Sequence, residues 1–163
     1  MNVSSIAAFR IDLSALIDAF AQASAEDSMT NPLAPAQWDV LSSYLLPVVL
    51  PAGQVLFSRG ANDRTLYFVE SGSLSVHFQD EKERLRLAMV AAGSVVGEGA
   101  FFSHRIRGAT VQASAPSKLW SLTAIRFTEL SNRQPAIALA LAMAAGSVMA
   151  KRLGNRRRRV AVT

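Results

Sequence analysis

The sequence predicts a mainly β domain with flanking helices (α+β), built as an eight-stranded β-roll or jelly-roll barrel. Two observations predict this class. Short β-favouring segments alternate with turn residues at intervals of about ten residues between positions 48 and 122, a spacing typical of barrels and sandwiches rather than βαβ units. Helical periodicity appears only before and after that stretch. We therefore expect a barrel whose strands are preceded and followed in the sequence by helices.

The N-terminal part predicts a helix, a linker and a second helix. Apolar residues recur at helical spacing over 5–23, which predicts an amphipathic helix whose stripe covers its own domain or, as an alternative, a partner subunit. The polar, proline-containing stretch 25–35 is a predicted linker. Pro35 suits a first helical turn, and the second helix should end before Pro47.

Eight strands are expected within a β-roll that spans 48–122. The clearest hairpin joins 67–70 to 74–78 around Gly72. The expected strands are 48–50, 54–58, 65–70, 73–78, 84–90, 95–96, 110–113 and 119–122.

After the strands, the sequence predicts C-terminal helices over 124–155. A short helix should end near Asn132, and a second should begin at Pro135 and continue to about Leu153. The second helix is apolar almost all round, so one face needs cover that a second copy in a symmetric homodimer would supply. Its longest apolar run, 136–150, is shorter than the ~20 residues of a membrane span, so no span is expected.

The net charge of +5 is concentrated at the C-terminal end. Residues 151–159 contain six of the seventeen basic residues, so the body of the chain is nearly neutral. We divide the chain into an N-terminal helix and linker (1–35), a main domain (36–155) and a basic tail (156–163). The tail is interpreted as a solvated helix end, with nucleic-acid contact or a protein partner or ligand lid as alternatives.

Composition excludes several classes of protein. The chain has no cysteine, which excludes disulfides and thiolate metal sites and fits a cytoplasmic location, as does the lack of a signal-like N-terminus. No nucleophile–base pair, metal-ligand cluster or catalytic carboxylate pair is apparent, so we expect neither an enzyme nor a metal or cofactor.

The most informative stretch is 93–113, where two glycines flank an acid in Gly97-Glu98-Gly99. Glycine favours a tight turn, and free amides in such a turn or at the start of a short helix suit an anion. Arg107 is a charged fork that matches phosphate oxygens, and Glu98 can accept a hydrogen bond from a sugar hydroxyl. Together, Arg107 and Glu98 predict a ligand that has both a phosphate group and a sugar hydroxyl.

This stretch resembles the phosphate-binding cassette of the cyclic nucleotide-binding domain family, which includes catabolite activator/FNR-type regulators. The similar residues are Gly97-Glu98-Gly99-Ala100-Phe101-Phe102, a loop over 103–106, and Arg107-Gly108-Ala109-Thr110-Val111. The segments 50–57, 59–60 and 66–74 are similar to the family's opening strands, and 149–153 is similar to the end of its dimer helix.

The resemblance implies a role for each cassette residue. Glu98 would bind the ribose 2′-hydroxyl and Arg107 the cyclic phosphate, in a site that begins at Gly97. The backbone amides of Gly99, Ala100, Gly108 and Ala109 would complete the cradle. The family's base-contacting positions fall on Arg156 and Arg157, which can stack on a purine or pair with guanine.

We therefore expect a regulatory sensor domain that binds cAMP and transmits occupancy through its terminal helices. Gly108, where cGMP-selective members often have threonine, favours cAMP, although Arg156 and Arg157 leave the base open and admit a cyclic dinucleotide. The alternative is a ligand-less scaffold or interaction domain, or a fragment of a transcription regulator, that acts through dimerisation and the basic tail. Glu98 and Arg107 would then form a structural ion pair. No helix-turn-helix follows the tail, so sequence-specific DNA binding by this chain alone is not expected.

Overall fold

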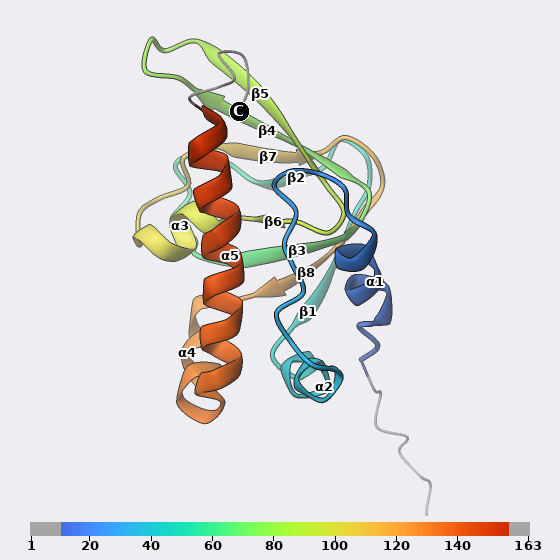
Figure 1. Cartoon of the computed structure of the whole chain (residues 1–163). Helices are drawn as coiled ribbons and strands as arrows, with labels where there is room; N and C mark the ends of the chain where they lie inside the picture. The colour runs from blue at the N-terminus through green and yellow to red at the C-terminus, as the bar shows by residue number, and fades with distance from the viewer. Residues whose placement is uncertain (1–10, 157–163) are drawn as a thin grey trace, which may run out of the picture.

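The computed structural model describes residues 11–156 of the chain. The described residues form two four-stranded antiparallel sheets and five helices (Figure 1). The first sheet has the order β1-β8-β3-β6 and the second the order β2-β7-β4-β5. Because strands that are distant in sequence alternate within each sheet, the predicted jelly-roll barrel with flanking helices is confirmed.

The predicted strands are all present, with small shifts at their ends. The predicted hairpin around Gly72 is wrong: β3 and β4 follow each other there, but β3 pairs with β6 and β8 in the first sheet and β4 with β5 and β7 in the second, so the chain crosses between the sheets at Gly72. The strands are β1 (Leu46–Leu50), β2 (Val55–Phe57), β3 (Leu66–Ser71), β4 (Ser73–Gln79), β5 (Leu85–Ala91), β6 (Val95–Val96), β7 (Thr110–Ala113) and β8 (Ser117–Leu122).

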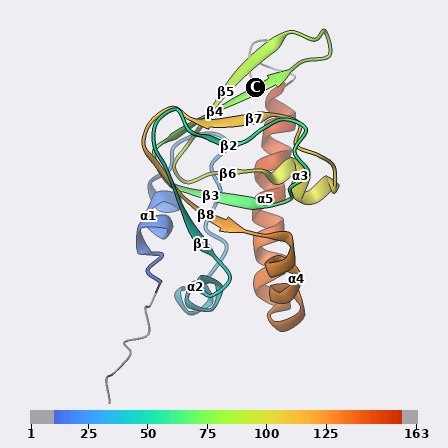
Figure 2. The ribbon, with the colours of Figure 1, turned by 180° about the vertical axis from the view of Figure 1, so that it is seen from behind.

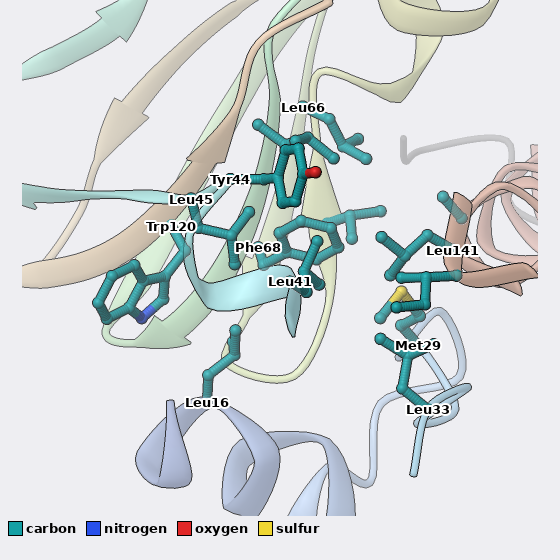
Figure 3. Packing of buried hydrophobic residues seen from close by; sticks show 14 of the residues in the cluster. Leu16, Met29, Leu33, Leu41, Tyr44, Leu45, Leu66, Phe68, Trp120 and Leu141 are labelled. Atoms are coloured by element: carbon teal, nitrogen blue, oxygen red, sulfur yellow. The ribbon is translucent and has the colours of Figure 1, made fainter. Parts of the chain in front are cut away.

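The two faces of the first sheet contribute to two separate apolar cores. Inside the barrel, Val69 and Leu119 of this sheet pack with Leu74 and Val111 of the other. On the outside, Phe68 and Trp120 are covered by helices and by the chain around Met29 (Figure 3). The barrel thus has a helical layer on one side, visible from both directions in Figures 1 and 2.

The N-terminal helix α1 (Ser14–Gln22) begins later than the predicted position 5. Residues 5–10 lie outside the described part of the chain. Within it, the Asp12 carboxylate accepts hydrogen bonds from the amide and hydroxyl of Ser14 at 2.9 and 2.6 Å. These bonds compete with helical geometry and start the helix after Asp12. The buried residues Leu16 and Phe20 place α1 on β3, so the helix covers its own domain as predicted.

The stretch expected to be a linker lies against the barrel. Met29 is buried, and its amide donates to the Gly93 carbonyl at 2.8 Å. The Ser94 hydroxyl donates to the Asp27 carbonyl at 2.7 Å. Helix α2 (Pro35–Ser42) follows with proline in its first turn, and its Trp38 stacks on Phe20 with ring centroids 5.7 Å apart.

The C-terminal helices are α4 (Ala124–Arg133) and α5 (Pro135–Arg156), preceded in the chain by the short α3 (Glu98–Ser103). Helix α5 buries one face on α4 and the barrel through Ile137, Ala138, Leu141, Ala145 and Val148. Within the described range, Pro135–Asn155 is also long and apolar enough to span a membrane by composition, with mean hydropathy 1.5. Core helices of soluble proteins meet the same criterion, so this is weak evidence for a span.

Candidate functional site

A cavity of about 700 Å³ opens between the second sheet, α3, the end of α5 and the N-terminal segment. It brings together chain segments that are far apart in the sequence. Its described lining consists of 25–27, Phe57, Val76, Phe78, Gln79, 88–90, 96–100, 107–109, Val111, Met149, Arg152, Leu153 and Asn155.

Gly97 shapes the floor of the cavity. Its φ of 85° is in the left-handed region, where glycine is favoured. A Cβ there would lie 2.6 Å from the Thr65 carbonyl oxygen and 2.7 Å from Arg107 Nη1, so only glycine fits. Helix α3 starts directly after it, and the amides of Glu98, Gly99 and Ala100 in its first turn have no carbonyl within the helix to bond. Gly99 has no neighbour that would exclude a Cβ.

Arg107 is buried, with 2% of the residue exposed. Its Nη2 donates to Asp63 Oδ2 at 2.6 Å and to the Thr65 carbonyl at 2.8 Å, and its Nη1 donates to the Gly97 carbonyl at 3.1 Å. The guanidinium carbon lies 3.9 Å from the centroid of the Phe57 ring, a cation–π contact. Its Nε has no hydrogen-bond partner among the described residues.

Asp63 is the charged partner of Arg107. Partial burial acts to raise the pKa of Asp63, but hydrogen bonds from Arg107 and Thr65 outweigh it and hold the pKa below its ordinary value of 3.8. Asp63 also accepts from the amide and hydroxyl of Thr65 at 3.1 and 2.8 Å. The carboxylate is therefore ionised at neutral pH and offsets the charge of Arg107.

Glu98 has a different partner. Arg152 of α5 donates from Nη1 to Glu98 Oε1 at 2.7 Å and from Nε to Asp27 Oδ2 at 3.0 Å. Burial acts to lower the pKa of Arg152, but the Glu98 and Asp27 carboxylates outweigh it and raise the pKa above its ordinary value. The alternative interpretation, a structural ion pair between Glu98 and Arg107, is therefore wrong, because each of the two has another oppositely charged partner.

The remaining walls of the cavity are largely apolar. Phe57, Val76, Phe78 and Val111 from the barrel face Met149 and Leu153 from α5. Two amide side chains, Gln79 and Asn155, also line the cavity, and Gln79 Oε1 accepts a hydrogen bond from Arg59. An apolar cleft with a few polar groups suits a flat, partly polar ring.

Comparisons with known proteins identify this arrangement. The model of the family described as "Cyclic nucleotide-binding domain" matches residues 47–134, more than half of the chain. The chain belongs to the cyclic nucleotide-binding domain family.

Individual relatives agree with this assignment. The chain is 35% identical over 94 residues to a cyclic nucleotide-gated potassium channel of Rhizobium etli, covering 58% of this chain and 25% of the channel. It is 28% identical over 112 residues to the cAMP-activated global transcriptional regulator CRP of Pasteurella multocida, covering 68% of this chain and 52% of the regulator. The chain thus spans at most about half of the length of these two relatives.

A solved structure shows the same fold. A cyclic nucleotide-binding domain from Methylobacillus flagellatus superposes with a TM-score of 0.71 at 19% identity, over 76% of this chain and 70% of that one.

The structure places the expected residues of the cyclic nucleotide-binding cassette around one cavity. The seven cassette residues expected from the sequence all line it: Gly97, Glu98, Gly99, Ala100, Arg107, Gly108 and Ala109. Their binding role stays a prediction. Arg156 is the last residue of α5, and Arg157 lies outside the described residues. Asn155, which directly precedes the two expected base contacts in the sequence, lines the cavity.

Three polar residues at this site were not expected from the sequence. Arg152 lies in the segment 149–153, which resembles the end of the family's dimer helix. That resemblance is the sequence feature that could have indicated a contact between Arg152 and the cassette. Asp63 lies in a polar turn, and Asp27 in the predicted linker. Neither position carries a pattern that points to a binding site, because only the folded chain brings them to Arg107 and Arg152.

The two histidines of the described chain have local partners. His77 Nε2 lies 3.0 Å from the Ser75 hydroxyl, and His104 Nε2 lies 3.0 Å from Arg64 Nη2. Among residues 11–156, no group of three or more metal-ligating side chains could hold a metal ion.

Proposed function

We propose that this chain is a cAMP-binding regulatory domain whose cassette binds the ligand as the sequence predicts. One observation carries the proposal: all seven expected cassette residues line one cavity of about 700 Å³, together with the end of α5.

Arg107 and Glu98 supply the two polar anchors. Arg107 Nε is a buried donor without a partner in the described chain, and an unsatisfied buried donor costs ~1–3 kcal/mol. A cyclic phosphate would satisfy it. Glu98 bonds Arg152 through Oε1, and a carboxylate has acceptor sites on both oxygens. A ribose hydroxyl would donate to this carboxylate.

The base would enter the apolar part of the cavity. Phe57, Phe78 and Val111 offer apolar surface, and Asn155 offers an amide donor and acceptor to the edge of a purine. Gly108 presents no hydroxyl, which favours cAMP over cGMP, and the CRP relative is described as cAMP-activated. We infer that Asn155 takes part in base contact beside Arg156 and Arg157.

Ligand occupancy would reach the rest of the molecule through α5. Because Arg152 of α5 bonds the cassette residue Glu98, a ligand that engages Glu98 changes the contacts of α5 and so biases its position. This supports a sensor that acts through its terminal helices. We infer a cytoplasmic chain without a membrane span, with 1–35 and 156–163 as appendages of the binding domain over 36–155.

The exposed face of α5 supports a homodimer. Leu139, Met143, Gly146, Ala150 and Leu153 alternate at spacings of four and three residues, the pattern of a coiled-coil seam. Leu139 and Met143 are 65% and 68% exposed. A second copy of the same helix would cover this seam.

A thermal-shift panel tests the proposed ligand. The wild-type chain, Arg107→Ala and Arg105→Ala are melted with cAMP, cGMP and cyclic di-GMP. At 100 times its dissociation constant a ligand adds ~2.7 kcal/mol, which raises the Tm of a chain of this size by about 5–10 °C. We expect this shift with cAMP for the wild type and for Arg105→Ala, whose arginine is an exposed loop residue outside the cavity lining.

For Arg107→Ala we expect no shift, with circular dichroism confirming that the variant is folded. A shift retained by Arg107→Ala would contradict the assigned phosphate contact. The absence of a shift with all three nucleotides in the wild type would favour the ligand-less scaffold. A shift with cyclic di-GMP or cGMP alone would keep the site and replace cAMP.

A further inference from the structure

The N-terminal segment 11–33 precedes the family match, which begins at residue 47. It nevertheless packs on the barrel, and its end reaches the cavity that the cassette residues line. A Cβ at Gly93 would lie 2.5 Å from the Ala19 carbonyl oxygen, so α1 approaches this turn as closely as backbone allows. Further along, the Met29 amide donates to the Gly93 carbonyl, and residues 25–27 form part of the cavity lining. Residues 25–27, which precede the part of the chain that matches the family, therefore form one wall of the pocket.

Asp27 attaches this segment at two points. Its carbonyl accepts from the Ser94 hydroxyl at 2.7 Å, and its carboxylate accepts from Arg152 Nε at 3.0 Å. The same guanidinium donates from Nη2 to the Ser94 hydroxyl at 3.1 Å and to the Val95 carbonyl at 2.9 Å. With Nη1 on Glu98 at 2.7 Å, all three nitrogens of Arg152 are engaged. Asp27 thus helps to fix the orientation in which Arg152 covers Glu98.

The charges at the pocket make this arrangement unfavourable for an anion. Its described lining contains the carboxylates of Asp27 and Glu98 beside Arg107 and Arg152, and Arg107 is already paired with Asp63. The docked segment therefore adds negative charge at a site that would receive a phosphate diester. It also keeps Arg152 on the carboxylate that a ribose hydroxyl would use.

We propose that residues 25–27 are a built-in antagonist of the pocket that acts through the Asp27–Arg152 ion pair, while buried side chains such as Phe20 and Met29 hold the rest of segment 11–33 on the barrel. The proposal rests on the proposed function, since it concerns the affinity of the same site. The contact of Asp27 with Arg152 and the binding of the nucleotide at Glu98 are coupled, because both involve the guanidinium of Arg152. Because coupling is reciprocal, a bound nucleotide weakens the contact of residues 25–27 with Arg152 by the same factor by which that contact weakens nucleotide binding.

Calorimetric titration of Asp27→Asn with cAMP tests the effect on affinity. The matched control is Asp18→Asn, which removes the same charge from an exposed position of α1 outside the cavity. We expect Asp27→Asn to bind about fivefold or more tightly than the wild type, the lower end of typical coupling, and Asp18→Asn to bind as the wild type does. Equal or weaker binding by Asp27→Asn overturns the proposal.

Hydrogen exchange of the Met29 amide, which bonds Gly93, tests the reciprocal effect. In the ligand-free state we expect faster exchange in Asp27→Asn than in the wild type or Asp18→Asn. Addition of cAMP should speed exchange in the wild type and have little effect in Asp27→Asn. Slower exchange on ligand addition to the wild type overturns the antagonism.

The two experiments separate this inference from the proposed function. If the wild-type chain binds none of the three nucleotides, the proposed function fails and the antagonism fails with it, yet the ligand-free exchange rates still show whether Asp27 docks the segment. If cAMP binds and neither the affinity nor the exchange responds to Asp27→Asn, the proposed function stands and the antagonism is wrong.

Discussion

The Arg107 guanidinium lies 2.6 Å from the Asp63 carboxylate, and 44 residues separate the two in the sequence. Arg107 also bonds the Thr65 and Gly97 carbonyls, so it ties the start of β3 to the start of α3. Arg107, the proposed phosphate-binding residue, therefore also connects two separate segments of the barrel through hydrogen bonds. Most of the N–H donors of Arg107 are already hydrogen-bonded within the protein, so a ligand must either replace these hydrogen bonds or use the remaining donors.

Asp63→Asn should destabilise the protein. The substitution leaves the buried Arg107 without its carboxylate, and a hydrogen bond to a charged group contributes ~1.5–3 kcal/mol. Since 40% of the Asp63 side chain is exposed, solvent screening reduces this, and we expect a loss of about 1–2 kcal/mol in the free energy of unfolding. Urea unfolding at pH 7 measures it. Asp18→Asn, an exposed acid in α1, is the control and should unfold as the wild type does.

The contribution of Asp63 should depend on pH in one direction. Because the folded pKa of Asp63 lies below its ordinary value of 3.8, the carboxylate stabilises the fold above that value, and the stabilisation is lost as the pH falls through the folded pKa. The difference in unfolding free energy between wild type and Asp63→Asn should be constant between pH 5 and 7 and shrink below about pH 4. A difference that grows on acidification would contradict this sign.

Local sequence features predicted most of the fold. The alternation of short apolar segments with turns such as that at Gly72 located the eight strands, because period-two burial and turn chemistry are local properties. The start of α1 was placed too early, since the apolar spacing continues through Ile6 and Phe9 whereas the Asp12–Ser14 hydrogen bonds determine where the helix begins in the described chain.

Only the part of the site that belongs to one continuous sequence motif could be predicted. Glu98 and Arg107 lie within ten residues of each other, so the cassette could be recognised from the sequence. Their actual charge partners, Arg152 and Asp63, are 54 and 44 residues away. Such pairs follow from tertiary packing, and no periodicity in one sequence indicates which acid meets which arginine. The alternative interpretation, in which Glu98 pairs with Arg107, is wrong for this reason.

Two glycines of the cassette, Gly97 and Gly99, should respond differently to alanine. Gly97→Ala places a Cβ against the Thr65 carbonyl and Arg107 Nη1 at a φ of 85°, so we expect a loss of ~1–3 kcal/mol or more from strain and displacement. Gly99→Ala meets no atom within 4 Å and lies in α3, so it should stabilise the protein by ~0.5–1 kcal/mol. Thermal unfolding of both variants compares them directly. Equal destabilisation would contradict the assigned roles.

The exposed seam of α5 should control the oligomeric state. Leu139 and Met143 lie one turn apart on this seam and are largely exposed in one copy of the chain. Replacing both with glutamate would put like charges opposite each other in a symmetric helix pair and oppose its association. Light scattering over a range of concentrations should show a dimer for the wild type and a monomer for Leu139→Glu/Met143→Glu. Ile125→Glu is the control, because Ile125 is 80% exposed and lies on α4 rather than on the seam of α5, and should leave the dimer intact. A wild-type monomer at every concentration would contradict the paired-helix interface, whereas a dimer that survives the double substitution would place the interface elsewhere on the molecule.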